Sequence, residues 1–147
     1  MKVSLRSTYG IMAAVDLALQ AGSAPIQAKS IARRQGIPAR FLEQVLHAMK
    51  KAGLVSSQRG AQGGYVLSKK PSEVSVAEIL EALEGPVLRI TDMNGGAYRA
   101  TPSGTLLAKV WDRVHAAERH VLEGITVEEL AGEQRHIEQQ RNPMYHI

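Results

Sequence analysis

Apolar residues recur at three- and four-residue spacing in two stretches between residues 25 and 52, and this spacing predicts two helices. The first stretch contains Ile31 and Ala32 and is followed by Gly36, a turn residue. The second begins at Ile37-Pro38, where proline suits an early helical position. Its apolar face contains Phe41, Leu42, Val45, Leu46 and Met49. Two short helices around a glycine turn predict a helix-turn-helix.

Two runs typical of β-strands follow the second helix. Residues 54–57 and 65–67 flank a glycine-rich segment at 58–64, which predicts a hairpin. A helix-turn-helix that leads directly into a hairpin is a winged helix. We therefore expect a mainly α fold with a small β wing, in the α+β class.

Further helical patterns lie on both sides of this motif. Residues 4–21 carry an apolar stripe that includes Leu5 and Val15, and Ser75 begins a helix that ends at Gly85-Pro86. Four units are expected: a winged helix-turn-helix domain, a loop, a pair of helices and a C-terminal tail. They cover residues 1–86, 87–102, 103–139 and 140–147, and the loop has room for a short strand at Val87–Ile90.

The charge is distributed unevenly. Residues 1–75 hold 11 Lys/Arg and 3 Asp/Glu, a balance of +8, whereas residues 76–147 hold 7 and 11, a balance of −4. These balances sum to the net +4 of the chain. A basic half that also contains the helix-turn-helix fits a phosphate-binding surface, and the alternative is a solvated basic face without a partner.

A DNA-binding winged helix places the exposed face of its second helix in the major groove. That face carries polar and charged residues, and Arg59 in the wing is placed to reach phosphates or the minor groove. Ser4 and Arg6 begin the first helix, where Ser4 either meets the DNA backbone or only caps the helix. The exposed candidates on the second helix are Arg40, Glu43, Gln44, His47 and Lys50.

The longest amphipathic segment runs from Ser103 to about Leu122. Its apolar face could complete the core of the same chain or pack on a partner helix. Because the winged helix already pairs its own apolar faces, and such proteins engage two half-sites, we interpret the segment as the dimerisation helix of a homodimer. The predicted seam contains Leu107, Val110, Trp111, Val114 and Val121.

The composition limits which cellular location, metal sites and enzyme activities we expect. The chain has no cysteine, no apolar run that spans a membrane and no signal-peptide pattern, so a cytoplasmic protein is expected. Its histidines are scattered; His115 and His120, five apart, do not share a helix face as metal ligands. We expect no enzyme activity, no cofactor and no metal site.

The chain contains several short motifs: Tyr9-Gly10, Phe41-Leu42-Glu43-Gln44, Ala52-Gly53-Leu54-Val55, Arg59-Gly60-x-x-Gly63-Gly64-Tyr65-x-Leu67 and Ile79-Leu80…Leu83-Glu84-Gly85. With these motifs it resembles the Rrf-two family of bacterial transcription regulators. The resemblance implies a dimeric winged-helix DNA-binding regulator, most simply a repressor, whose long penultimate helix pairs across the dimer. It also implies that Arg40, Phe41, Glu43 and Gln44 lie on the recognition helix. On the wing it places Arg59, Gly60 and Gly64.

One departure from the family pattern concerns residues 89–104. Cluster-binding members carry three cysteines there, and this chain has none. The resemblance is therefore to the cysteine-free, CymR-like branch, which implies a role in cysteine or sulfur metabolism.

The C-terminal tail ends Met-Tyr-His-Ile, which is apolar for a chain terminus. It is similar to Ile-ended tails that dock on cysteine synthase, so Tyr145 and Ile147 are candidate docking residues for that enzyme. The alternative is that these side chains fold back onto the dimer core. A second class of function also stays open, a winged-helix protein-interaction module whose main partner is a protein such as cysteine synthase.

Overall fold

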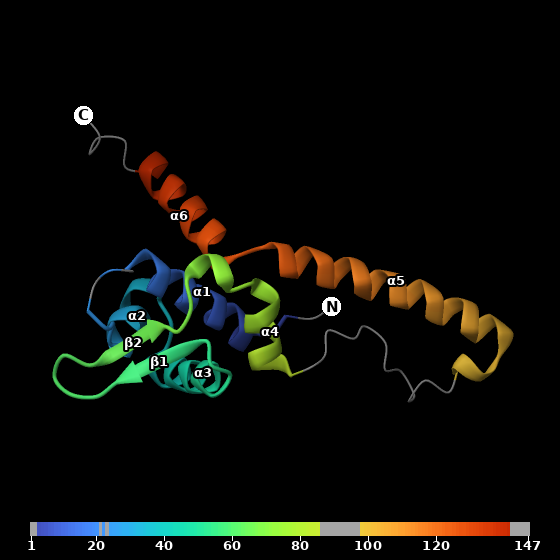
Figure 1. Cartoon of the computed structure of the whole chain (residues 1–147), viewed down its shortest axis with the longest axis horizontal. Coiled ribbons are helices and arrows are strands. Elements are labelled where there is room, and N and C mark those ends of the chain that lie inside the picture. The colour runs from blue at the N-terminus through green and yellow to red at the C-terminus, as the bar shows by residue number, and fades with distance from the viewer. Residues whose placement is uncertain (1–2, 21, 23, 86–97, 142–147) are drawn as a thin grey trace.

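The computed structural model describes residues 3–20, 22, 24–85 and 98–141. Figure 1 shows the first four helices and a hairpin gathered together, with two further helices that extend from them. The mainly helical fold with a small antiparallel sheet confirms the predicted fold class. The elements are α1 (Leu5–Leu19), α2 (Ala28–Gln35), α3 (Ala39–Lys51), β1 (Val55–Gln58), β2 (Gly64–Leu67), the 3-10 helix η1 (Pro71–Glu73), α4 (Val76–Glu84), α5 (Pro102–Gly124) and α6 (Val127–Arg141).

Helix α1 lies at the centre of the fold and packs on α2, α3, α4 and α6. Its small residues Ala13 and Ala14 are fully buried, which lets the neighbouring helices approach closely. The prediction that Leu5 belongs to this buried stripe is wrong, because its side chain is 58% exposed. Leu5 is the first residue of α1 and points to solvent, whereas Ser7 in the same turn is buried. The apolar face predicted for α3 is confirmed at Leu42, Val45, Leu46 and Met49, all fully buried.

The turn between α2 and α3 depends on Gly36. Its φ of 67° lies in the left-handed region, where a side chain is disfavoured, and its amide closes α2 on Ala32. Helix α3 then begins after Pro38, close to the predicted start. The helix-turn-helix read from the sequence is therefore present.

The wing is a two-stranded antiparallel hairpin in which Val55 pairs with Leu67 and Gln58 with Gly64. One further residue extends it, because Ile26 exchanges two backbone hydrogen bonds with Tyr65, of 3.0 and 2.7 Å. This bridge ties the wing to the segment that leads into α2. Wing and helix-turn-helix are thus held in one body.

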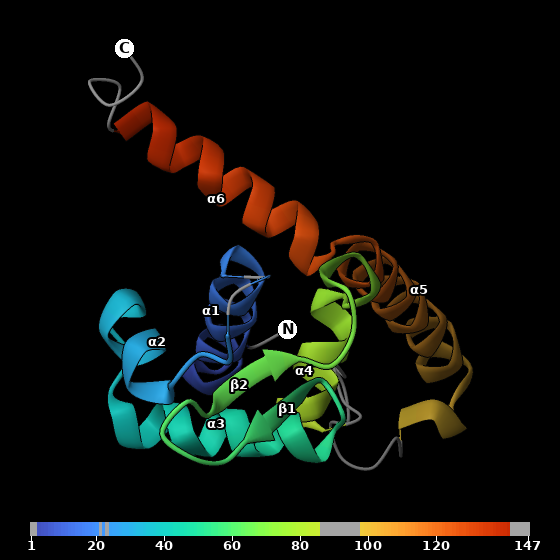
Figure 2. The same cartoon turned by 60° about the vertical axis from the view of Figure 1, so that its left-hand side comes forward.

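The two C-terminal helices behave differently from each other. Helix α6 begins inside the winged-helix body: Val127 and Ala131 are buried, and the Val127 amide donates to the Val74 carbonyl at 2.9 Å. Helix α5 contacts α4 and otherwise extends away from the core, as Figure 2 shows. Pro102, predicted in the loop, is the first residue of α5, and the possible strand at 87–90 lies outside the described residues.

Candidate nucleic-acid interface

The exposed face of α3 forms an open groove together with the start of α1. Arg6 from α1 and Arg40, Glu43, Gln44 and His47 from α3 line it. Five residues predicted from two separate parts of the chain are therefore brought together. Because the buried face of α3 is fixed in the core, this opposite face is rigidly presented to a partner.

The groove is basic and open to solvent. Arg6, Arg40 and Lys51 supply three cations, and Glu43 supplies the opposing carboxylate. Within the described residues neither Arg40 nor Lys51 makes an ion pair, so both cations face solvent. Arginine and glutamine are also the side chains that pair with the edges of guanine and adenine. The groove thus combines cations with side chains of the types that pair with base edges.

Two of the residues predicted for DNA binding lie on α3 but do not line the groove. Phe41 faces the core side of α3, where its ring meets the Tyr9 ring edge to face at a centroid distance of 5.4 Å. It therefore packs α1 on α3, as its place on the predicted apolar face indicates, and does not line the groove. Lys50 is exposed in the last turn of α3 but does not line the groove, and Lys51 takes that place. Successive residues of an α-helix are rotated by about 100°, so Lys51 points to the groove and Lys50 points to one side of it.

Ser4 is the N-cap of α1, which favours the capping alternative over a phosphate contact. Its hydroxyl accepts from the Ser7 amide at 3.1 Å and donates to the Glu84 carboxylate. The same carboxylate oxygen accepts from the Ser4 amide at 3.1 Å and the Ser7 hydroxyl at 2.6 Å. These bonds from Ser4 and Ser7, with the nearby Arg6 charge, lower the pKa of Glu84 below its usual value.

Glu84 was not singled out as a site residue by the sequence. It links the last turn of α4 to the first turn of α1, the turn that carries Arg6. The interaction spans 80 positions in the chain, so no local pattern could reveal it. Its effect is to fix the direction in which α1 presents Arg6 to the groove.

In the wing, Arg59 is exposed beside the turn, as predicted. Gly60 adopts a φ of 106° and its carbonyl accepts from the Gly63 amide at 3.0 Å, so it shapes the turn. Gly64 has a different role from the predicted one. A Cβ there would overlap the backbone of Ile26, so this glycine permits the bridge between wing and helix-turn-helix.

An ion pair between a buried carboxylate on α1 and a partly exposed guanidinium on α2 joins these two helices. The Asp16 carboxylate accepts from Arg34 Nε at 3.0 Å and Nη2 at 2.8 Å, and from Gln35 Nε2 at 3.0 Å. The hydrogen bonds from Arg34 to Asp16, with the Asp16 charge, raise the pKa of Arg34 above its usual value. An aspartate inside the apolar stripe between Val15 and Leu17 was the sequence signal for a buried partner, and it was missed.

Most of the large apolar side chains that are exposed in the described part of the chain lie on α5. Leu107, Val110 and Val121 are 45%, 48% and 57% exposed, and Trp111 and Val114 are half-buried. These five predicted seam residues recur at heptad-like positions on one side of the helix. Leu106, 65% exposed, lies beside them.

A helix-turn-helix with a basic reading face and a wing defines a winged-helix DNA-binding protein. Comparison with known proteins makes the class specific. The family model for Rrf2, described as an iron-dependent transcriptional regulator, matches residues 3–133. The chain belongs to the Rrf2 family of transcriptional regulators.

Relatives support this at the level of sequence. The chain is 35% identical to the transcriptional regulator CymR of Bacillus subtilis over 133 residues, covering 89% of this chain and 90% of CymR. It is 34% identical to IscR of Aliivibrio salmonicida over 130 residues, covering 88% of this chain and 77% of IscR. These relatives are regulators of transcription, as the fold and groove indicate.

Solved structures agree. The structure of CymR, the global cysteine regulator of B. subtilis, superimposes with a TM-score of 0.74 at 33% identity, covering 90% of this chain and 98% of that one. An IscR from T. potens superimposes with a TM-score of 0.72 at 36% identity, covering 91% and 88%. The predicted resemblance is confirmed.

The iron in the family description does not fit the donors of this chain. The sequence supplies no cysteine thiolate, and the described residues contain no group of three His, Asp or Glu side chains that could hold a metal ion. No helix among the described residues has the length and apolarity to cross a bilayer. The candidate docking residues Tyr145 and Ile147 lie outside the described ranges.

Proposed function

We propose that the chain reads its operator through the α3 groove, with Arg40, Glu43, Gln44 and His47 at the base edges and Arg6 and Lys51 on the backbone. The observation that carries this is the convergence of these side chains on one open face. The wing supplies a separate contact through Arg59. Base-edge contacts determine sequence preference, whereas phosphate contacts supply affinity that falls with salt.

Two substitutions separate these roles in a binding assay on labelled operator DNA. Gln44→Ala should change the preference among bases at one position by ~1–3 kcal/mol. Arg59→Ala should weaken binding to all sequences and reduce the salt slope by about one. Gln139→Ala and Arg135→Ala, both exposed on α6, are the matched controls. If Gln44→Ala and Arg59→Ala lowered affinity equally on operator and random DNA, the assignment of Gln44 to base reading would be wrong.

We further propose that the chain is a homodimer held together by α5. The exposed seam at Leu107, Val110 and Val121 supports this, because a helix with such a face needs an apolar partner in water. A twofold arrangement would place two reading helices on half-sites about one helical turn, ~34 Å, or a multiple of it apart.

Val114→Asp tests the dimer. It would bury an unpaired carboxylate in the seam, at a cost of several kcal/mol, so the variant should sediment as a monomer and lose most operator affinity. Ala116→Asp is the control, because it lies on the opposite, exposed side of α5 and should leave the dimer intact. A folded Val114→Asp protein that still sediments as a dimer would place the interface elsewhere.

For the regulated process we propose cysteine supply, with cysteine synthase as the protein partner of the C-terminal tail. The similarity to CymR, named as a global cysteine regulator, supports the process, and the Met-Tyr-His-Ile terminus supports the partner. Removing Tyr145, His146 and Ile147 should abolish binding to cysteine synthase in titration calorimetry and leave the dimer folded. Equal binding by both forms, or binding by neither, would refute the tail's role.

A further inference from the structure

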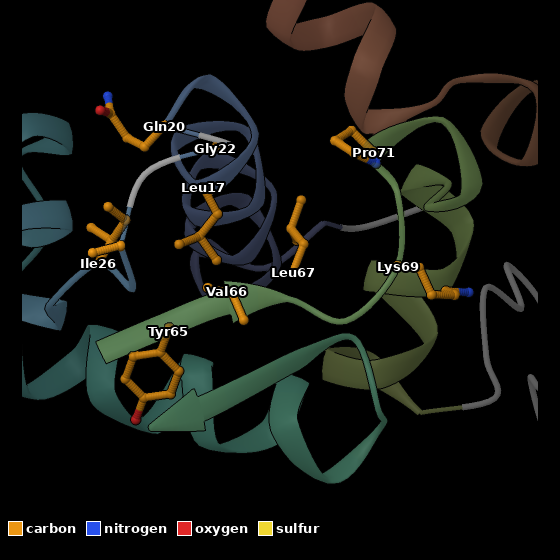
Figure 3. Close-up of a pocket in the computed structure, with 10 residues that line it drawn as sticks. Leu17, Gln20, Gly22, Ile26, Tyr65, Val66, Leu67, Lys69 and Pro71 are labelled. Carbon is orange, nitrogen blue, oxygen red and sulfur yellow. The ribbon is translucent and has the colours of Figure 1, made fainter. Parts of the chain in front are cut away.

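A pocket of about 170 Å³ opens on the side of the wing away from the α3 groove. Its apolar walls come from the end of α1, the segment before α2, and β2. In Figure 3 Ile26 and Pro71 lie at its two ends, with Leu17 and Leu67 between them. The Tyr65 ring points away from these residues.

One wall of this pocket is an open strand edge. Gly64 and Val66 face β1 in the register of the hairpin, and the Ser68 amide donates to the Leu54 carbonyl at 3.0 Å. Tyr65 and Leu67 therefore direct their amides and carbonyls outward, because alternate residues of an antiparallel strand face opposite edges. Tyr65 satisfies both groups with Ile26. Within the described ranges, the outward groups of Leu67 have no hydrogen-bond partner.

The register identifies the missing partner. Since Ile26 pairs antiparallel with Tyr65, continuing the ladder would place Ala24 opposite Leu67. That second pair does not form, and Ala24 and Leu67 both line the pocket. The pocket thus occupies the position beside Leu67 that a paired residue of a third strand would fill.

We propose that this pocket binds a small free amino acid with an apolar side chain, such as valine or leucine. Its carboxylate accepts from the Leu67 amide and its ammonium donates to the Leu67 carbonyl, as a paired strand residue would. Its side chain packs on Leu17, Ile26 and Pro71. The volume suits such a ligand, since a cavity of about 150 Å³ holds benzene.

The charge of the lining favours a carboxylate over a neutral or cationic ligand. Among the described residues that line the pocket none is acidic, and Lys69 is the one that is charged. The Lys69 ammonium points to Glu78 at 2.6 Å in a pair that is more than one third exposed on both sides. Exposed pairs of this kind are weak, so Lys69 can turn to a bound carboxylate at little cost.

The position of the pocket connects the ligand to DNA binding. The inference rests here on the proposed reading of DNA by α3 and the wing. A ligand on Leu67 and Ile26 adds to the bridge that Ile26 and Tyr65 already form between the wing and the segment that leads into α2, and so further stabilises this orientation of the wing relative to α3. If the ligand and DNA favour the same orientation of the wing, each raises the affinity of the protein for the other. The amino acid should therefore raise operator affinity by about fivefold or more.

Calorimetry on the full-length protein without DNA tests the site. L-valine or L-leucine should bind at one site per chain, in the micromolar to millimolar range. Isovalerate lacks the ammonium and isobutylamine lacks the carboxylate, and each should bind about tenfold more weakly or worse. Equal binding of the analogues, or no binding of either amino acid, would overturn the proposal.

A pair of variants tests the strand edge. Leu67→Pro removes the outward amide and leaves the β1 ladder intact, whereas Leu67→Ala keeps the amide and serves as its control. Leucine binding should survive in the alanine variant and disappear in the proline variant; equal binding by both would refute the contact. The analogue series needs no variant and decides the case if Leu67→Pro does not fold.

Operator binding measured with and without leucine separates this inference from the proposed function. Operator binding without any calorimetric leucine signal would refute the ligand site alone. Leucine binding without any operator binding would refute the DNA-reading groove alone. Leucine binding that leaves operator affinity unchanged would overturn the coupling between the two sites.

Discussion

The ion pair between Asp16 and Arg34 offers a direct test of how the helix-turn-helix is held on α1. Asp16→Asn keeps the size of the side chain but removes its charge and turns one acceptor into a donor that faces Arg34 and Gln35. The Asp16 side chain is 2% exposed, so water cannot replace the lost bonds there. Removing one partner of a fully buried pair costs about 3–5 kcal/mol.

The Arg34 side chain is 39% exposed, which reduces this cost. Its guanidinium can turn to water when the carboxylate is lost, so we expect Asp16→Asn to destabilise the protein by ~2–3 kcal/mol. The reverse change should cost more, because Arg34→Met leaves the buried Asp16 carboxylate with Gln35 as its remaining bonded partner. We therefore expect Arg34→Met to lower the free energy of unfolding by more than Asp16→Asn does.

Urea unfolding followed by far-ultraviolet circular dichroism, at one fixed protein concentration, measures both values. The urea concentration at the midpoint of unfolding should fall, and the slope of the free energy of unfolding against urea concentration should stay unchanged, as expected for a change in stability alone. Asp112→Asn is the control, since its contact with Arg99 is 3.5 Å long and exposed on both sides; we expect a change within about 0.5 kcal/mol. A loss in free energy of unfolding for Asp16→Asn that is no larger than the loss for Asp112→Asn would refute a stabilising role of the buried carboxylate.

Two further predictions concern the Glu84 bonds to the start of α1 and the glycines of the wing. The lowered pKa of Glu84 gives stability that is present above its unfolded-state pKa near 4.5 and is lost as the pH falls through the lower folded value. Glu84→Gln should therefore be less stable than the wild type at pH 6, and this difference should shrink below pH ~4.5 in pH-dependent urea unfolding; a constant difference would contradict it. Gly64→Ala should destabilise the wing more than Gly60→Ala, since both have positive φ but Gly64 alone abuts the Ile26 backbone. Equal melting temperatures for these two variants would show that the contact with Ile26 does not matter.

Local patterns along the chain were enough for the fold and for most of the reading face. The buried face of α3, the turn at Gly36 and the wing hairpin follow from the spacing of apolar and turn residues, which acts over a few positions. The same spacing put Arg40, Glu43, Gln44 and His47 on the opposite face of α3. It also favours Lys51 over Lys50, because at 100° per residue Lys51 lies in line with Arg40, Gln44 and His47, and this was missed.

Only the tertiary structure decided which of these residues meet and what they do. Phe41 packs on Tyr9, Ser4 bonds to Glu84, and Gly64 lies against Ile26, each through contacts between segments far apart in the chain. The open edge at Leu67 has the same origin, because it depends on where Ala24 leaves the strand. Such contacts are set by how helices and strands pack in three dimensions, and the periodicity of one segment carries no information about the segment it will touch.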